Sequence, residues 1–182
     1  AIIAFWLIIK HKGSLTGKKE NLKVLLYRSI FGTLGVIFNY YAIDKLMLSD
    51  ANMLNKMSPF LVVIFCAIAL KEKINVKQIG AIIIAFIGAL FIIKPTFSVE
   101  VIPYLGGIAG AVFAAMAYTC LRVLGDREDY YTIVFFFSVF SLVTVGPIAF
   151  AVYEPMTLMQ LIYLLLGGVF ASLGQFGITL AY

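Results

Sequence analysis

The sequence predicts an all-α polytopic membrane protein, built as a bundle of transmembrane helices. Hydrophobic residues make up 63% of its 182 residues and charged residues only 13%, about half the charged fraction of an average soluble domain. The charged residues gather in short segments between apolar stretches of about 20 residues, the length that crosses a bilayer core. The net charge of +5 therefore belongs to loops. We expect contact with the lipid bilayer and none with nucleic acid.

Six apolar stretches are long enough to be interpreted as membrane helices, and charged or turn-forming residues separate them. A shorter apolar run at 1–9 and a polar loop at 10–23 precede them. We expect the chain to be a piece of a longer protein, truncated inside a helix at each end. The predicted spans cover 24–43, 51–70, 74–93, 101–121, 130–152 and a helix from about 158 to the last residue.

The basic residues are distributed unevenly over the two sides of the membrane. Eleven of the fourteen Lys and Arg residues lie in three alternating segments, 10–28 (with Arg28 at its end), 71–77 and 122–127, whereas the loops between them carry only Lys45 and Lys94. Because Lys and Arg are enriched in cytoplasmic loops, we expect the first group to be cytoplasmic and the protein to lie in the plasma membrane. The predicted cytoplasmic loops are 10–23, 71–77 and 122–129.

The second span contains the most unusual residue of the sequence, Lys56. The span follows Ser49 and Asp50, which are suited to cap a helix N-terminus. A Lys deep in a membrane helix costs about 3 kcal/mol on insertion scales. Two interpretations stay open: the ammonium lines a water-filled cavity, or its stem reaches back to the outer interface, about 9 Å along the axis near Asp50.

The residues that share the face of Lys56 favour the cavity. Asn52, Asn55 and Pro59 complete a helical spacing of i, i+3, i+4 and i+7 with it. A polar face on a spanning helix usually looks into the bundle or into a water-filled cavity. Because Pro59 has no amide N–H, we expect a free backbone carbonyl near Asn55 and a bend in the helix.

Three polar residues of other spans are further candidates for the cavity. Asn39 and Tyr40 lie in the outer half of the first span. A buried Asn39 requires partners, either across helices or in a solvated cavity, and Tyr40 either lines the cavity or belongs to the interfacial aromatic belt. Gln175 supplies an amide in the last span.

Enzymatic chemistry finds no support in the sequence. We expect no Asp or Glu inside a membrane helix, which excludes a carboxylate proton relay or an aspartyl protease within these residues. The single histidine, His11, lies in a basic loop, and Cys66 and Cys120 lie in different spans. No phosphate-binding or dinucleotide-binding motif is present. We predict a protein that is not an enzyme and that holds no cofactor and no metal.

Small residues and a weak internal repeat indicate how the helices pack. Glycines and alanines, which let membrane helices approach closely, are present in the third and sixth spans and are densest in the fourth. The segments LGVIFNYYA at 34–42 and LGQFGITLA at 173–181 share three identities and lie five helices apart. They therefore cross the membrane in opposite directions, as the halves of an inverted repeat do.

The stretch from 54 to 95 carries three marks that occur together. Ser58 and Pro59 stand in mid-helix, Glu72 stands at the helix end, and Gly80 and Gly88 follow in the next helix. With these marks the stretch resembles the EamA-type repeat of the drug/metabolite transporter superfamily. The resemblance is specific over 24–95 and looser from about 101 onward.

The resemblance implies ten helices in two inverted five-helix repeats. Residues 1–95 would hold the first repeat without its first helix and most of its second, and residues 101–182 the second repeat without its last two helices. Members of the superfamily move small organic solutes, which implies a secondary transporter that works by alternating access. Lys56 would then attract an anionic or zwitterionic solute, and a homodimer is left open.

A different class of function is the alternative. A non-transport scaffold or sensor would bind a partner helix through the face formed by Asn52, Asn55 and Lys56. A crosslink from position 55 or 56 to such a helix, without access of water, distinguishes it from a transporter.

Overall fold

The computed structural model describes residues 2–11, 14–71, 75–93, 101–152 and 155–181. These residues form helices joined by loops, and no strand occurs among them. Five helical segments are long and apolar enough to cross a membrane, which confirms the predicted all-α polytopic membrane protein. They are Lys19–Lys45, Leu48–Leu70, Val101–Leu124, Tyr130–Ala151 and Leu158–Ala181.

The helices begin and end close to the predicted limits, because the apolar stretches are bounded by charged residues. The third predicted span corresponds to α5, whose apolar part, Val76–Gly88, is shorter than the other spans. The complete order is α1 (Ile2–His11), the 3-10 helix η1 (Lys19–Asn21), α2 (Leu22–Lys45), α3 (Leu48–Asn55), α4 (Ser58–Leu70), α5 (Val76–Ile93), α6 (Val101–Leu124), the 3-10 helix η2 (Gly125–Arg127), α7 (Tyr130–Ala151) and α8 (Leu158–Ala181).

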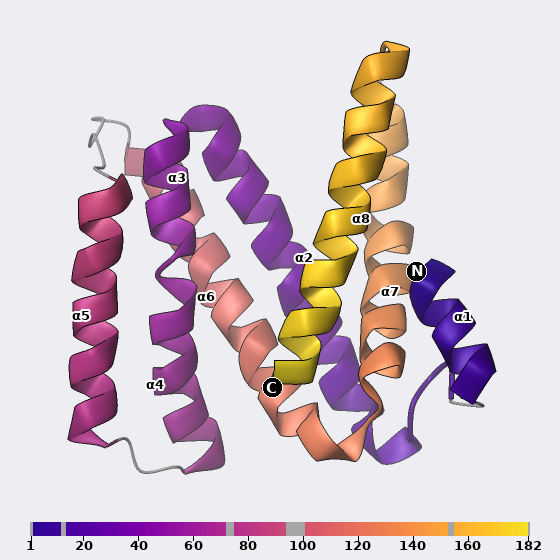
Figure 1. Ribbon diagram of the computed structural model, residues 1–182, viewed down its shortest axis with the longest axis horizontal. Helices are drawn as coiled ribbons and strands as arrows, with labels where there is room; N and C mark the ends of the chain where they lie inside the picture. The colour runs from indigo at the N-terminus through magenta and orange to yellow at the C-terminus, as the bar shows by residue number, and fades with distance from the viewer. Residues whose placement is uncertain (1, 12–13, 72–74, 94–100, 153–154, 182) are drawn as a thin grey trace. The chain divides into compact units, whose positions relative to one another are not determined.

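The second predicted span is broken. Instead of one helix over 51–70, α3 and α4 follow one another beside α5, separated at Lys56 and Met57 (Figure 1). Pro59 lies in the first turn of α4 and has no N–H with which to continue the helix, so the helix is interrupted beside the residue at which a bend was predicted. The expected free carbonyl is wrong, because the Ser58 hydroxyl donates a hydrogen bond of 2.9 Å to the Asn55 carbonyl oxygen.

The start of α3 also differs from the prediction. The residue before the helix is Met47, and no side chain caps it, so the proposed capping by Ser49 and Asp50 is wrong. The helix begins early enough to bring Asp50 into its first turn, where the carboxyl is fully buried. The Tyr104 hydroxyl of α6 donates a hydrogen bond to Asp50 Oδ2. The expectation that no membrane helix contains an acid is therefore wrong.

The chain divides into two compact units, and each is described by itself. The first unit contains Ala1–Ser29 and Leu124–Tyr182, and the second contains Ile30–Val123. In the first unit, α7 contacts both α1 and α8. The ring of Phe5 on α1 lies 5.8 Å from that of Phe135 on α7, measured between centroids.

Two loops of the first unit are fastened together at a site that we name the loop clasp. Glu128 Oε1 accepts hydrogen bonds from the Lys18 backbone N–H at 2.7 Å and from the Asn21 side-chain amide at 2.8 Å. Beside it, the buried Thr132 hydroxyl donates to the Ser14 carbonyl at 2.9 Å. These bonds join the loop before α2 to the loop before α7.

The core of the second unit depends on close contact with α6. A Cβ added to Gly110 would lie 3.1 Å from the Asn39 backbone nitrogen, and one added to Gly35 would lie 3.0 Å from the Ala114 nitrogen. This confirms the close packing predicted for the fourth span. In the third and sixth spans, an added Cβ would meet nothing within 4 Å among the described residues, so the predicted close packing of these two spans stays a prediction. The added Cβ would have this space at Gly80, Gly88, Gly167, Gly168 and Gly174.

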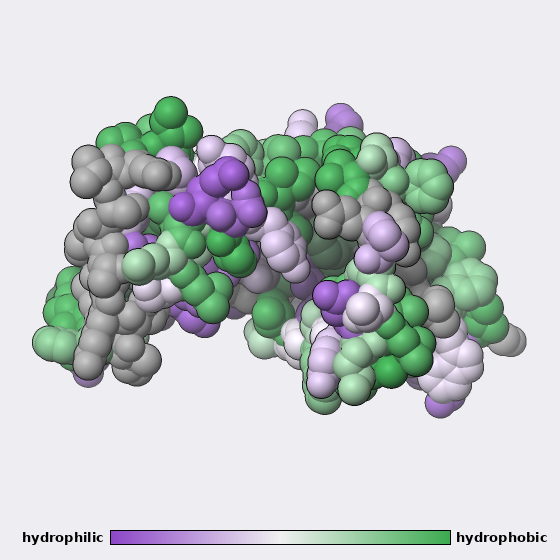
Figure 2. Space-filling model, turned by 90° about the horizontal axis from the view of Figure 1, so that it is seen from above, coloured by the Kyte–Doolittle hydropathy of each residue, from purple (hydrophilic) through white to green (hydrophobic). Residues whose placement is uncertain are grey.

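Large apolar side chains remain exposed on most of the spans. On α8, none of the apolar window is buried within the chain, and exposed residues such as Leu164 and Phe170 lie along it. The space-filling view shows the same character, with apolar side chains over much of the visible surface (Figure 2). Such a surface suits a hydrocarbon environment or further helices.

Candidate functional site

The first candidate site is the exposed polar face of the broken span, formed by Asn52, Asn55 and Lys56. Successive residues of a helix are about 100° apart, so α3 separates its side chains into two faces. The three polar residues are exposed, whereas Asp50 and the apolar residues opposite them are buried. The prediction that these polar residues share one face is thus consistent with the structure.

The positive charge of this face lies at the break between α3 and α4. Lys56 follows the last residue of α3, and its backbone N–H still bonds to the Asn52 carbonyl at 3.0 Å. Its ammonium forms no ion pair with the residues that the structure describes. A cation with two neighbouring amides can bind a carboxylate or phosphate through charge-assisted hydrogen bonds.

The other predicted residues of the second unit lie on neighbouring helices. Pro59 is exposed in the first turn of α4. On α2, Tyr40 is 66% exposed, and Asn39 is half-buried with its backbone against Gly110. Within the described part of the chain, neither Asn39 nor Tyr40 forms a side-chain hydrogen bond with the polar face. Glu72 lies outside the described residues.

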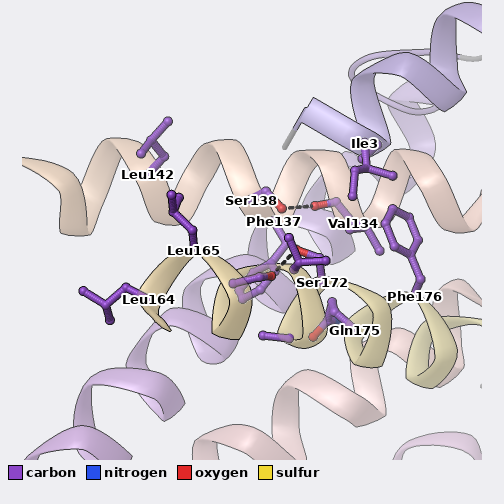
Figure 3. A pocket seen from close by; sticks show the side chains of 14 residues that line it. Ile3, Val134, Phe137, Ser138, Leu142, Leu164, Leu165, Ser172, Gln175 and Phe176 are labelled. Atoms are coloured by element: carbon purple, nitrogen blue, oxygen red, sulfur yellow. Dashed lines mark hydrogen bonds between the residues drawn. The ribbon is translucent and has the colours of Figure 1, made fainter. Parts of the chain in front are cut away.

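The second candidate site is a cavity of about 760 Å³ in the first unit, and Gln175 of α8 lines it. Its walls come from α1, α7 and α8. Phe137 and Ser172 lie between α7 and α8, and Ile3 of α1 lies to one side near Val134 (Figure 3). The polar lining residues are Ser138, Ser172 and Gln175, and no charged side chain lines it among the described residues.

Hydrogen bonding inside this cavity leaves mainly acceptors. The hydroxyls of Ser138 and Ser172 each donate to the backbone carbonyl one turn earlier, at 2.8 Å. Gln175 Nε2 donates a long bond of 3.4 Å to the Thr179 hydroxyl. The cavity therefore suits an apolar group that carries an uncharged hydrogen-bond donor. Gln175 belongs to a different unit from the other predicted residues.

Three residues of interest escaped the sequence analysis. Asp50 was interpreted as a capping residue, and nothing in the sequence pairs it with Tyr104. Arg28 was counted with a cytoplasmic segment, but it is buried inside α2 with its guanidinium carbon 4.1 Å from the centre of the Phe137 ring. Its position about one turn inside the predicted span 24–43 was the available signal. No cluster of His, Cys, Asp and Glu suited to a metal occurs in the described residues.

Several known proteins with similar sequences are transporters by name. The chain is 32% identical to a protein named pseudopaline exporter CntI from Pseudomonas aeruginosa, over 99% of this chain and 64% of that protein. It is 27% identical to solute carrier family 35 member G1 from Mus musculus, over 96% of the chain and 52% of the relative. An uncharacterized transporter from Helicobacter pylori is 25% identical over 91% of the chain and 58% of its own length.

The chain thus spans about two thirds or less of the length of these relatives. No solved structure matches it. The EamA-like transporter family matches residues 1–94, more than half of the chain, including the broken span and the glycines of α5. The predicted resemblance is therefore confirmed, and the chain belongs to the EamA-like transporter family.

Proposed function

We propose that this protein is a secondary transporter of small organic solutes that works by alternating access. The observation that carries the proposal is the broken span α3–α4, with its exposed polar face, in a chain of a transporter family. Interrupted membrane helices are typical of solute sites in secondary transporters, since they turn polar backbone groups and helix ends toward the solute. The names of the relatives, an exporter and a solute carrier among them, support the same function.

The solute that this face fits is anionic or zwitterionic. Lys56 supplies the positive charge, and the amides of Asn52 and Asn55 supply hydrogen bonds to the rest of a polar group. Asn39, Tyr40 and Pro59 are proposed to border the same pathway. The protein would lie in the plasma membrane with its basic loops in the cytoplasm. Separately, within the first unit, the cavity at Gln175 is proposed to bind an uncharged group of a small solute.

Transport is tested first without a known solute. Metabolites inside and outside cells that express the protein are compared with those of cells that lack it, and the solutes that differ are assayed in proteoliposomes. We expect at least one anionic or zwitterionic metabolite to differ and to cross the proteoliposome membrane only when the protein is present. Equal metabolite profiles, together with a partner helix crosslinked to position 55, would favour the scaffold function instead.

The role of Lys56 is tested by substitution in the same proteoliposomes. Lys56→Ala removes a charge-assisted hydrogen bond, so transport at low solute concentration is expected to fall about tenfold or more. Lys56→Arg keeps the charge and is expected to retain part of the activity. Lys77→Ala on α5 is the matched control and is expected to transport normally. Unchanged transport by both Lys56 variants would contradict the assignment.

A further inference from the structure

The buried carboxyl of Asp50 has no part in the proposed solute site and requires its own account. The Tyr104 hydroxyl donates to its Oδ2, and the Ser49 hydroxyl donates to its Oδ1 at 3.3 Å. Asp50 also stands in the first turn of α3, where the helix dipole favours a negative charge. The two donors thus satisfy both oxygens of a carboxyl that is fully buried.

A second contact joins the same two helices one turn away. A Cβ added to Gly107 of α6 would lie 3.3 Å from the Leu54 Cβ of α3, so Leu54 packs directly on the glycine. Asp50 and Leu54 are four residues apart on α3, and Tyr104 and Gly107 are three apart on α6. Each pair therefore lies along one face of its helix. The two contacts together resist rotation of α3 about its own axis.

The short helix α3 depends on such contacts for its orientation. It has eight residues, too few for a helix that is stable by itself. The turn at Lys56 and Met57 interrupts the regular helix between α3 and α4, but both turn residues keep right-handed helical backbone angles. The rotation of α3 is therefore set by α4 together with the contacts that α3 itself makes. Its buried apolar residues pack in a cluster with residues of α2 such as Ala42, and this packing selects the face of α3 that is buried. The hydrogen bond to Asp50 is directional.

We propose that Asp50 and Tyr104 are positioning residues that fix the rotation of α3 and thereby hold the polar face of Asn52, Asn55 and Lys56 toward the solute pathway. The hydrogen bond at Asp50 holds one side of α3 on α6, and the polar residues lie on the other side. The part of this inference that concerns the pathway rests on the proposed function, whereas the anchoring of α3 does not.

The anchoring is tested by the rate of disulfide formation between positions 54 and 107 in the full-length protein in native membranes. Cys66 and Cys120 are first replaced by Ala, and Leu54→Cys and Gly107→Cys are then introduced. The Cβ separation of this pair, 3.3 Å, is close to that of a disulfide. We expect copper phenanthroline to form the bond readily. Adding Tyr104→Phe, which keeps the ring, is expected to slow it about tenfold.

Rescue separates the hydrogen bond from general packing. Asp50→Asn keeps an oxygen that can accept the hydrogen bond from the Tyr104 hydroxyl. Its crosslinking rate is therefore expected to stay near the rate measured with Asp50 and Tyr104 both present. Asp50→Leu is expected to slow crosslinking as Tyr104→Phe does. Tyr163→Phe on α8 is the control, because this tyrosine is exposed. Equal rates of disulfide formation with Tyr104 and with Tyr104→Phe would overturn the proposal, whether or not Asp50→Leu folds.

A second measurement distinguishes the anchoring from the proposed pathway. The labelling of Asn55→Cys by a membrane-impermeant maleimide is compared with that of Met53→Cys on the buried face. With Asp50 and Tyr104 present, we expect the cysteine at position 55 to react with the maleimide and the cysteine at position 53 to be protected. Tyr104→Phe is expected to make the labelling rates at the two positions more similar. If position 55 is never labelled while crosslinking depends on Tyr104, the pathway assignment fails and the anchoring is upheld. If transport persists while crosslinking ignores Tyr104, the anchoring fails and the transporter is upheld.

Discussion

At the scale of single residues, the carboxylate of Glu128 joins parts of the chain that are far apart in sequence. Its hydrogen bond from the Lys18 N–H spans 110 residues, and its bond from the Asn21 side chain spans 107. Glu128→Ala removes both acceptors and leaves the buried Asn21 amide with a weaker partner, the Arg127 carbonyl at 3.4 Å. We expect a loss of about 1–3 kcal/mol of stability, measured as a lower Tm in detergent by about 2–4 °C per kcal/mol.

Two further variants show whether the effect comes from the loop clasp. Glu128→Gln keeps an oxygen that accepts both N–H groups, so its Tm is expected to lie between those of the native protein and Glu128→Ala. Glu20→Ala removes an exposed acid of η1, next to Asn21, and is expected to leave the Tm unchanged. Equal Tm values for Glu128→Ala and Glu20→Ala would show that the clasp does not stabilise the protein.

At the scale of helices, glycines that look alike in the sequence differ in how much space surrounds them. Alanine is favoured over glycine in a helix by about 1 kcal/mol, so Gly→Ala stabilises a helix wherever there is space. At Gly110 the new Cβ would lie 3.1 Å from the Asn39 backbone nitrogen, and backbone cannot move aside as a flexible side chain does. We expect Gly110→Ala to lower the free energy of unfolding by about 1–3 kcal/mol.

The control for this prediction is Gly80→Ala, since nothing lies within 4 Å of an added Cβ there. It is expected to leave the stability unchanged or to raise it slightly. Both variants are compared by thermal unfolding in the same detergent. A loss of stability at Gly80 equal to that at Gly110 would contradict the packing difference between α5 and α6.

The same scale shows what the sequence could reveal about the helices. The limits of the spans could be predicted, because burial in lipid demands a continuous apolar stretch of sufficient length. The exact place of the break at Lys56 and Met57 could not, because only Pro59 signals an irregularity and it does not fix the residue at which the helix is interrupted. The bond from Ser58 to the Asn55 carbonyl depends on the geometry of that break. The polar face could be predicted from helical spacing alone.

At the scale of the whole chain, composition identified the class of protein and left the details of the candidate sites open. A lipid environment accounts for the exposed apolar side chains, and this follows from the composition without knowledge of the fold. The cavity at Gln175 and the pairing of Asp50 with Tyr104 depend on contacts between residues that are far apart in sequence. A single sequence, without related sequences to compare with it, carries no signal for such contacts.

The orientation of the chain in the membrane is the last prediction, and it rests on the uneven distribution of basic residues. Eleven Lys and Arg residues lie on one predicted side, against Lys45 and Lys94 on the other, so the loop that contains Thr16 is expected to be cytoplasmic and Met47 extracellular. In protein without Cys66 and Cys120, a membrane-impermeant maleimide added to intact cells should label Met47→Cys and not Thr16→Cys. Inverted vesicles should give the opposite result. Labelling of Thr16→Cys from outside intact cells would reverse the orientation, and the outward position of the α3 polar face would then have to be reversed as well.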